Sequence, residues 1–589
     1  MADLEHKAGA IAATRRRLCT GARTRALLLG LPDDVWQLIT PLLSLRDLGR
    51  LSRVSRKAYT IGADDCRTLP LTNYRACRLW AARLPRARLR LRLTWRDPDM
   101  EPRTTALVAA GAVDELCLKS PPNRRGLPSP TDIPIPEFAS LATVHKVHIE
   151  PAKFAVCPPW LVGVHTVGLY ACHRLTDVHA LAGAHTVTLW DCDRVKDFAP
   201  LAGVHDLTLY ARHGWRTESP TLSCTSLGNI TRLYICGYDV ADVACLARVH
   251  TLTLASVQTP LDMSLLARVH TLNVHGCSQL RNVSALGDVH DLNLSFSNAS
   301  DVSALGRVHR LNISGCDLVT DISSLRNVPE LYLDNYEQGA DLAPLGNHRL
   351  LSLEDSPVSD VSSLGGVHTL WLGDTLVTDV SALRRVRVLN LCFTPVEDVS
   401  ALAHARELNL WGCHHVSDVS ALGGVTHLNL SECPLVTDVS ALGRVTSLLL
   451  TRCAGVSDVS ALGRVRLLFL SGCTGVVDVS ALAHVRTLSL AGCSGVTDLS
   501  PLTDVRVLDI SATRHAPPTL PDMTVFQSCR IVPEKVHYVD WEWDRFRERV
   551  EDSHTHDEFS VNAFVRQLDR DTRDELDLFF GCFEVYECV

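Results

Sequence analysis

A stretch between Asp398 and Pro501 repeats one pattern five times with a period of 20 residues. The successive copies read DVSALAHARELNLWGCHHVS, DVSALGGVTHLNLSECPLVT, DVSALGRVTSLLLTRCAGVS, DVSALGRVRLLFLSGCTGVV and DVSALAHVRTLSLAGCSGVT. A unit this short cannot bury its apolar side chains alone, so each copy must stack on its neighbours. The sequence therefore predicts a solenoid, with the rest of the chain serving as caps and attachments.

Apolar residues fall at fixed positions of each repeat. In the copy from Val269 to Asp288 they occupy positions 1, 4, 6, 12, 15 and 18, and cysteine or a small substitute takes position 9. The L-x-L alternation at positions 4 and 6 predicts a short strand whose apolar side faces the core. The 20 residues leave no room for a full α-helix on the return path, so we expect turns or short 3₁₀ segments there.

This pattern resembles the leucine-rich repeat, L-x-x-L-x-L-x-x-N/C-x-L, over roughly 370 residues. The resemblance implies an α/β repeat solenoid of about 19 coils of 19–20 residues, with a parallel sheet on the concave face. The predicted parts of the chain are a basic arm (1–26), a helical domain (27–70), a linker and N-terminal cap with a degenerate first repeat (71–140), the solenoid (141–514) and an acidic, partly helical C-terminal cap (515–589).

Charge and cysteine spacing narrow the function classes. The net charge of −8 gives no reason to expect nucleic acid as a partner. No stretch approaches the roughly 18 consecutive apolar residues of a membrane helix, and residues 1–26 lack a signal-peptide core. The 21 cysteines are spaced by the repeat instead of being paired, which argues against a disulfide framework. The glycosylation acceptors Asn293, Asn312 and Asn429 fall in predicted strands, where secretion would attach glycans. We therefore expect a protein of the cytoplasm or the nucleus that binds neither membrane nor nucleic acid.

Residues 27–62 predict two short amphipathic helices. The first begins at Leu31-Pro32-Asp33-Asp34, with proline near the first turn and acids at the positive end of the helix dipole. The second runs from Leu45 to Ala58. Two helices of this size cannot form a stable core alone, so they must pack against something else, and an N-terminal cap for the solenoid is one such role.

The Leu-Pro start, the Asp-Leu pair and the Val-Ser pair of this segment resemble an F-box, by which substrate receptors dock on the Skp adaptor of cullin–RING ubiquitin ligases. The segment departs from that family at Tyr59, where the family more often has Trp, and at Pro41 inside the first helix. The resemblance implies a Skp-type adaptor and a cullin as partners. The residues that would form or support the adaptor contact are Leu31, Pro32, Ile39, Leu42, Leu48, Leu51 and Val54.

Positions 3, 5, 7 and 8 lie on the concave strand face, and there the repeats stop resembling one another. Aromatic residues fall at position 7 of three successive coils and should form a column. Exposed aromatics are favoured anchors in protein interfaces, whereas partial cover by an insertion at 211–229 is the alternative. The residues predicted to bind an unknown target protein on this face are Tyr170, Trp190, Tyr210, Trp371, Trp411, His427 and Phe469.

Position 9 carries cysteine in nine coils and serine or threonine in four shorter ones. A small, weakly hydrogen-bonding side chain is expected where the chain turns out of the strand, and a metal or redox role would not accept Ser and Thr so readily. We therefore predict a structural ladder. Its cysteines are Cys172, Cys192, Cys277, Cys316, Cys413, Cys433, Cys453, Cys473 and Cys493.

Two further repeated steps have structural explanations. In the D-V-S step, as at Asp418 and Ser420, the carboxylate can accept bonds from following amides and start a turn or 3₁₀ segment, with a calcium column as the alternative. The Val-His step would stack imidazoles on successive coils. One histidine per coil gives a line instead of the tetrahedral cage of zinc, so we predict no metal there.

No catalytic constellation stands outside the repeat: there is no phosphate-cradling glycine loop, no paired Cys-x-x-Cys cluster and no nucleophile motif. We therefore expect neither an enzyme nor a cofactor. The sequence predicts a non-catalytic substrate receptor that recruits a target protein to a Skp–cullin–RING ubiquitin ligase. The alternative is a leucine-rich-repeat scaffold or decoy without a ligase role.

Overall fold

The structure is a computed structural model, and it describes residues 68–71, 88–94, 113–119, 141–150, 154–211, 221–240, 242–257, 260–337, 339, 341–505, 507–510 and 530–532. The chain divides into two compact units, Met1–Leu311 and Asn312–Val589. The basic arm and the F-box-like segment predicted from the sequence lie outside the described residues, as does nearly all of the acidic C-terminal segment.

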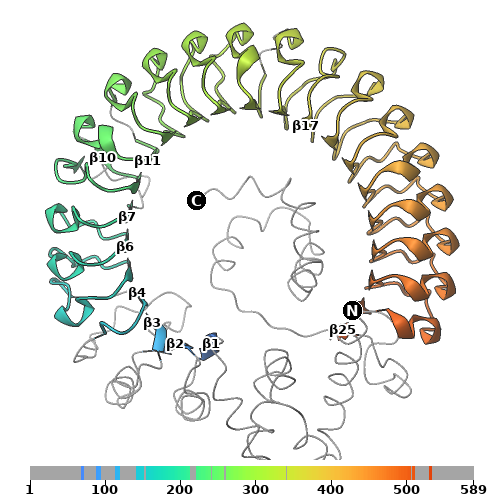
Figure 1. Ribbon diagram of the computed structural model, residues 1–589, viewed down its shortest axis with the longest axis horizontal. Coiled ribbons are helices and arrows are strands. Elements are labelled where there is room, and N and C mark those ends of the chain that lie inside the picture. Colours follow the sequence, from blue (N-terminus) through green and yellow to red (C-terminus); the bar gives the residue numbers. More distant parts are fainter. Residues whose placement is uncertain are drawn as a thin grey trace, which may run out of the picture. The chain divides into compact units, whose positions relative to one another are not determined.

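The first unit is built on parallel strands, each paired with the strand of the next coil (Figure 1). From Val113 onward the pairing is in register, whereas the strand before it pairs with a register shift between Leu89 and Arg90. Val187, for example, pairs with Leu207. These strands are β1 (Thr68–Leu71), β2 (Arg88–Thr94), β3 (Val113–Lys119), β4 (Lys146–Glu150), β5 (Thr166–Tyr170), β6 (Thr186–Trp190), β7 (Asp206–Tyr210), β9 (Arg232–Cys236), β11 (Thr251–Ala255), β12 (Thr271–Asn273) and β13 (Asp291–Asn293). A separate parallel pair is formed by β8 (Thr221–Leu222) and β10 (Asp239–Val240), and β14 (Arg310–Asn312) lies at the boundary between the units.

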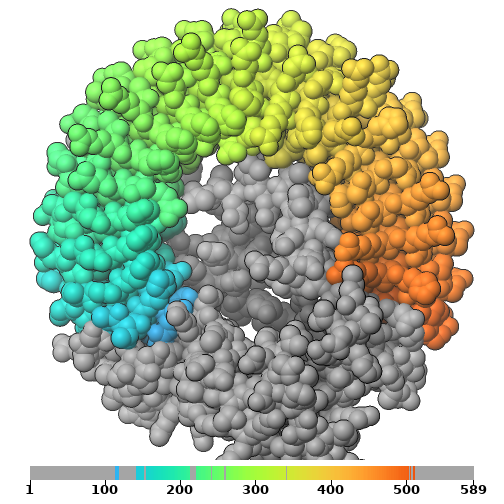
Figure 2. All heavy atoms as spheres, viewed as in Figure 1, coloured from blue at the N-terminus to red at the C-terminus, as the bar shows by residue number. Residues whose placement is uncertain are grey.

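The second unit has the same construction, with three-residue strands like β12 and β13, again parallel and in register. They are β15 (Glu330–Tyr332), β16 (Leu350–Ser352), β17 (Thr369–Trp371), β18 (Val388–Asn390), β19 (Glu407–Asn409), β20 (His427–Asn429), β21 (Ser447–Leu449), β22 (Leu467–Phe469), β23 (Thr487–Ser489), β24 (Val507–Asp509) and β25 (Arg530–Val532). In the space-filling view, successive coils within a unit are in direct contact (Figure 2).

Short 3₁₀ segments return the chain from one strand to the next. In each unit they line the outer side of the coils, and the strands line the inner, concave side (Figure 1). They are η2 (Pro159–Leu161), η3 (His179–Leu181), η4 (Ala199–Leu201), η5 (Ala244–Arg248), η6 (Met263–Leu266), η7 (Ser284–Leu286), η8 (Ser303–Leu305), η9 (Ser323–Asn327), η10 (Ala343–Leu345), η11 (Ser381–Leu383), η12 (Ser400–Leu402), η13 (Ser420–Gly424), η14 (Ser440–Arg444), η15 (Ser460–Arg464), η16 (Ser480–His484) and η17 (Ser500–Asp504). Among the described residues there is no α-helix, and none of these segments is long and apolar enough to cross a bilayer.

The D-V-S step starts these segments as predicted. The Asp418 carboxylate accepts a hydrogen bond from the Ser420 backbone amide at 2.9 Å, and Asp438 and its serine repeat the contact at 2.9 Å. Asn282 does the same with the Ser284 amide at 3.1 Å. The contact therefore requires a side-chain oxygen two residues before the amide, but this oxygen need not be charged.

The core of each unit is a stack of apolar columns between the strands and the 3₁₀ segments. Leu428, Leu448 and Leu468 pair in register along one such column and are all fully buried. Within these short coils burial alone would not fix the spacing, so the hydrogen bonds between coils set the distance from one strand to the next. The predicted solenoid with a parallel concave sheet and short 3₁₀ segments is confirmed.

Candidate functional site

The outward side chains of the strands form the candidate site. In β6, Val187 and Leu189 point into the core and are buried, whereas Thr186, Thr188 and Trp190 on the other face are half-buried. This alternation follows from the pleat of a strand, in which neighbouring side chains point to opposite faces. The periodic scaffold thus presents one non-periodic row of side chains from each coil.

Tyr170, Trp190 and Tyr210 lie at matching register positions of β5, β6 and β7. The structure stacks two of them: the Trp190 and Tyr210 rings have centroids 3.7 Å apart and an interplanar angle of 17°. Tyr170 instead folds back over Gly168 toward His148, and the two ring centroids are 5.7 Å apart. A side chain at position 168 would collide with Tyr170, so the glycine is what allows this orientation.

Trp411 is half-buried, and its ring contacts that of Phe393 at a centroid distance of 4.8 Å. Phe393 is 39% exposed and was missed by the sequence analysis. A sequence signal existed, because Phe393 stands at position 8, where several other coils place glycine. The structure shows that its φ of 55° is left-handed. A bulky aromatic residue is uncommon in that region of the backbone.

Two predicted anchors are buried. Trp371 is 5% exposed and packs its ring edge-on against Tyr332, with centroids 6.1 Å apart. Phe469 is 0% exposed, between the buried Leu449 and Ser489 on the flanking strands. The prediction that these two side chains are exposed was wrong, because alternation along a strand says which face a residue occupies and not what covers that face.

His427 is half-buried at the start of β20, and burial together with the nearby Arg406 lowers the pKa of its imidazole. It therefore tends to be neutral at pH 7.

A cluster of buried and half-buried polar groups extends from the end of β14 to β18, and sequence reasoning missed it. The Asp334 carboxylate accepts bonds from the hydroxyls of Ser314, at 3.1 Å, and Ser352, and from the Glu354 backbone amide at 3.1 Å. Glu354 in turn accepts a bond from the Asn390 side-chain amide at 2.6 Å. Burial, with repulsion from Asp334, raises the pKa of Glu354 to about 7.

Imidazoles stack on successive coils of the first unit, as predicted for the Val-His step. One column comprises His145, His165, His185 and His205, with ring centroids 4.4 to 4.7 Å apart. The other comprises His250, His270, His290 and His309, each 4.7 Å from the next. Burial and the two flanking imidazoles lower the pKa of His165. Neutral rings can stack at this distance, whereas two charged rings would repel each other.

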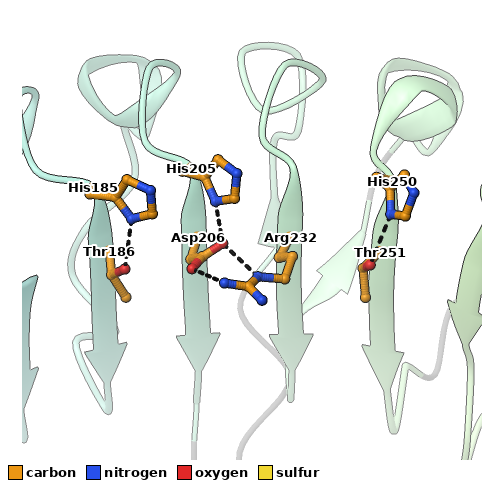
Figure 3. A network of polar contacts seen from close by, with 7 residues as sticks. All are labelled: His185, Thr186, His205, Asp206, Arg232, His250 and Thr251. Atoms are coloured by element: carbon orange, nitrogen blue, oxygen red, sulfur yellow. Dashed lines mark hydrogen bonds and ion pairs between the residues drawn. The ribbon is translucent and has the colours of Figure 1, made fainter.

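An ion-pair network sits at the end of the first column (Figure 3). Asp206 lies 2.7 Å from Nδ1 of His205, and Arg232 donates to both carboxylate oxygens, at 2.7 and 2.5 Å. The arginine holds the pKa of Asp206 down at about 2, and the histidine contact adds to the effect. In two other coils of this view, Nδ1 of His185 and of His250 lies within hydrogen-bond distance of a threonine hydroxyl instead of a carboxylate.

The ladder cysteines are all buried, and none of the described cysteines forms a disulfide. The Cys433 thiol donates to the carbonyl oxygen of Leu410 in the preceding coil at 3.1 Å. Cys453, Cys473 and Cys493 repeat this bond at 2.9 Å. Ser356 reaches the equivalent carbonyl at 3.4 Å, so the hydroxyl can replace the thiol. Burial raises the pKa of Cys453 to about 11, which makes it unreactive near neutral pH.

No protein-family model matches this chain, and no curated protein matches it. Both units are parallel repeat solenoids. Solved structures with a similar backbone fold include internalin InlF of Listeria monocytogenes, at 18% identity over 53% of this chain and 84% of that one, with a TM-score of 0.31. The functional domain of InlJ from the same species, which includes a cysteine ladder, aligns at 16% identity over 60% and 75%, with a TM-score of 0.33. The mouse RP105/MD-1 complex aligns at 13% identity over 80% and 91%, with a TM-score of 0.42. At these values the likeness adds no argument about function.

Proposed function

We propose that the chain is a non-catalytic protein-binding scaffold that serves as a substrate receptor in the cytoplasm or the nucleus. Its strand face would hold a target protein, and residues 27–62 would dock on the Skp-type adaptor of a cullin–RING ubiquitin ligase. The observation that supports the binding role is the contrast between a periodic core and a non-periodic outward face in the same strands. The docking role is supported by the F-box resemblance alone.

The outward aromatic pairs are the best candidates for target contacts. Trp190 stacks on Tyr210, and Trp411 packs against Phe393, so each pair is held in place before a partner arrives. Rigid aromatic side chains lose little conformational entropy on binding and are common among the residues that dominate interface energies. Trp371 and Phe469 are excluded from this role because they are buried.

The docking role is tested by a pull-down with purified Skp adaptor and cullin. Wild-type protein should bind, a Leu31→Ala, Pro32→Ala double variant should not, and a Gln37→Ala variant, which alters a residue outside the apolar set, should bind like wild type. Circular dichroism would show that each variant keeps its solenoid. Absence of binding by folded wild-type protein would leave a scaffold or decoy without a ligase role.

A second measurement separates these two functions on chemical grounds. In an assembled ligase with ubiquitin-conjugating enzyme and a captured target, a receptor increases ubiquitin transfer to the target. A scaffold or decoy leaves the rate unchanged or lowers it. The comparison of wild type with the Leu31→Ala, Pro32→Ala variant tests the adaptor contact without altering the strand face.

A further inference from the structure

Two groups of side chains in the first unit combine two imidazoles with a carboxylate. The first consists of His185, His205 and Asp206, and the second of His270, His290 and Asp291. Within each group, one possible ligand atom per residue lies within 4.8 Å of the other two. The four histidines are exposed and the two aspartates half-buried, so both groups are open to solvent.

The same arrangement arises twice for the same structural reason. In four of the eight coils of the two columns, threonine follows the stacked histidine, and its hydroxyl lies within hydrogen-bond distance of Nδ1, as at 3.2 Å for His185 and 3.3 Å for His270. Aspartate takes the place of threonine after His205 and His290. There a carboxylate oxygen lies 2.7 Å and 3.0 Å from Nδ1.

The donor set indicates which ions would bind. Two imidazole nitrogens and one carboxylate oxygen suit zinc and its neighbours cobalt, nickel and copper, whereas calcium and magnesium prefer oxygen ligands alone. Three protein ligands also leave a coordination position for water or for a group on a partner. The sequence argument against a metal counted one imidazole per coil, and it did not place an aspartate beside two of them.

We propose that each of these two groups binds one divalent transition-metal ion, with zinc as the representative case. The ion would replace the proton between Nδ1 and the carboxylate oxygen in His205–Asp206 and in His290–Asp291, and the imidazole of the preceding coil would supply the third ligand. This proposal goes beyond the receptor function and does not depend on it.

The stacked rings have to move to bind an ion. Their centroids are 4.6 Å apart in the first group and 4.7 Å in the second, at interplanar angles of 18° and 16°. Bonds of about 2.0 Å in a tetrahedral site place ligand atoms roughly 3.3 Å apart. The rings must therefore turn out of parallel so that ligand atoms now up to 4.8 Å apart approach by up to about 1.5 Å, while the Nδ1–carboxylate contacts of 2.7 and 3.0 Å lengthen slightly. Exposed side chains can make this adjustment while the paired strands stay in register.

Arg232 has two opposite effects on the first site. Its bonds to both oxygens of Asp206, including the one beside His205 Nδ1, orient the carboxylate, as hydrogen bonds to metal ligands commonly do. Its positive charge also opposes the incoming cation. Arg310 follows Asp291 in the corresponding place, with its backbone amide bonded to the His290 carbonyl at 3.1 Å. We therefore expect moderate affinity, and an Arg232→Gln variant should bind zinc about tenfold more tightly at the first site.

The test uses tag-free, full-length protein freed of metal with a chelator and titrated with zinc by calorimetry. The variant Asp206→Asn, Asp291→Asn should lose two bound ions per chain relative to wild type, and each single variant should lose one. His368→Gln removes an exposed histidine that is followed by threonine, and it should lose none. A second pair, His205→Gln and His290→Gln, repeats the test at different ligands, and thermal melts show that the variants are folded.

Cobalt(II) absorption shows which ligands hold the ion. Nitrogen and oxygen ligands give weak visible bands, and thiolates add a strong charge-transfer band in the near ultraviolet. The ladder cysteines are buried, and burial raises the pKa of Cys453 and Cys493 to about 11, so these thiols are poor competitors for the ion. The proposal would be supported if the double aspartate variant binds two fewer ions than wild type and the intensity of any thiolate band is the same in both proteins. An equal number of ions in wild type and the double aspartate variant, or none in folded wild type, would overturn it.

Discussion

Replacement of Glu354 by glutamine should stabilise the protein at alkaline pH and leave it unchanged at acid pH. Burial and repulsion from Asp334 raise the pKa of Glu354 from its ordinary value of 4.5 to about 7, while the bond from Asn390 opposes the rise. The folded state therefore holds this proton more tightly than the unfolded state, so stability from this site is full below about pH 4.5 and is lost as the pH rises through about 7.

This difference corresponds to about 3 kcal/mol at most, since each pKa unit is worth about 1.4 kcal/mol. Glutamine keeps the oxygen that accepts from Asn390 Nδ2 at 2.6 Å, but it carries no charge. Glu354→Gln should therefore raise the free energy of unfolding by up to about 3 kcal/mol at about pH 8 and by little at about pH 4.

Urea unfolding of both proteins at these two pH values would measure the effect. The shift in transition midpoint should appear at the higher pH only, with an unchanged denaturant dependence. Asp438→Asn is a matched control, because it removes one negative charge from an exposed carboxylate whose pKa is lowered by its bonds to Ser440. A glutamine variant that is equally or less stable at alkaline pH would refute the argument, because it would mean that Glu354 is ionised and favourably paired in the fold.

Three further pairs of substitutions test contacts within and between coils. Cys453→Ser should cost about 1 kcal/mol or less because a hydroxyl can keep the 2.9 Å bond to the preceding coil, whereas Cys453→Val should cost about 1 to 3 kcal/mol in urea unfolding. Asp438→Ala should lower the melting temperature because it removes the acceptor of a 3₁₀ amide, and Asp438→Asn should not. Gly463→Ala would place a methyl carbon 2.3 Å from the Ala481 carbonyl oxygen and should destabilise by about 1 to 3 kcal/mol, whereas Gly183→Ala, with nothing within 4 Å, should be neutral in the same melts.

The strands and 3₁₀ segments could be predicted from sequence because they depend on contacts that recur every coil. Leu428 and Leu448 meet because both belong to the same position of neighbouring repeats, and periodicity alone reveals that position. The Asp418 contact with the Ser420 amide is local, over two residues. Both kinds of contact can be predicted from a single sequence. The leucine contacts recur with the period of the repeat, and the contact of the carboxylate with the amide joins residues that are close in sequence.

The candidate site was less predictable, because its contacts join residues that do not share a position. Glu354 reaches past Gly373 to Asn390, two strands away, and a methyl carbon at position 373 would lie 2.7 Å from Cys392 Sγ and 3.0 Å from the Glu354 carboxylate. Trp371 was placed on the correct face, but its burial depends on neighbours such as Tyr332. Such contacts break the repeat, so no periodic argument could locate them.

Departures from the repeat are also where the structure accepts local strain. Position 8 is left-handed in coil after coil, and glycine fills it at Gly412 and Gly472 without cost. Phe393 adopts the same conformation with a large ring, which an L-residue does only at an energetic cost. The missing side chain at position 412 makes room for that ring, since a methyl carbon there would lie 2.4 Å from it, and the ring then packs on Trp411. A glycine in one coil and a strained aromatic in the coil before it thus build one aromatic pair on the outward strand face, with Phe393 exposed and Trp411 half-buried, and this placement is why the pair is one of our proposed target contacts.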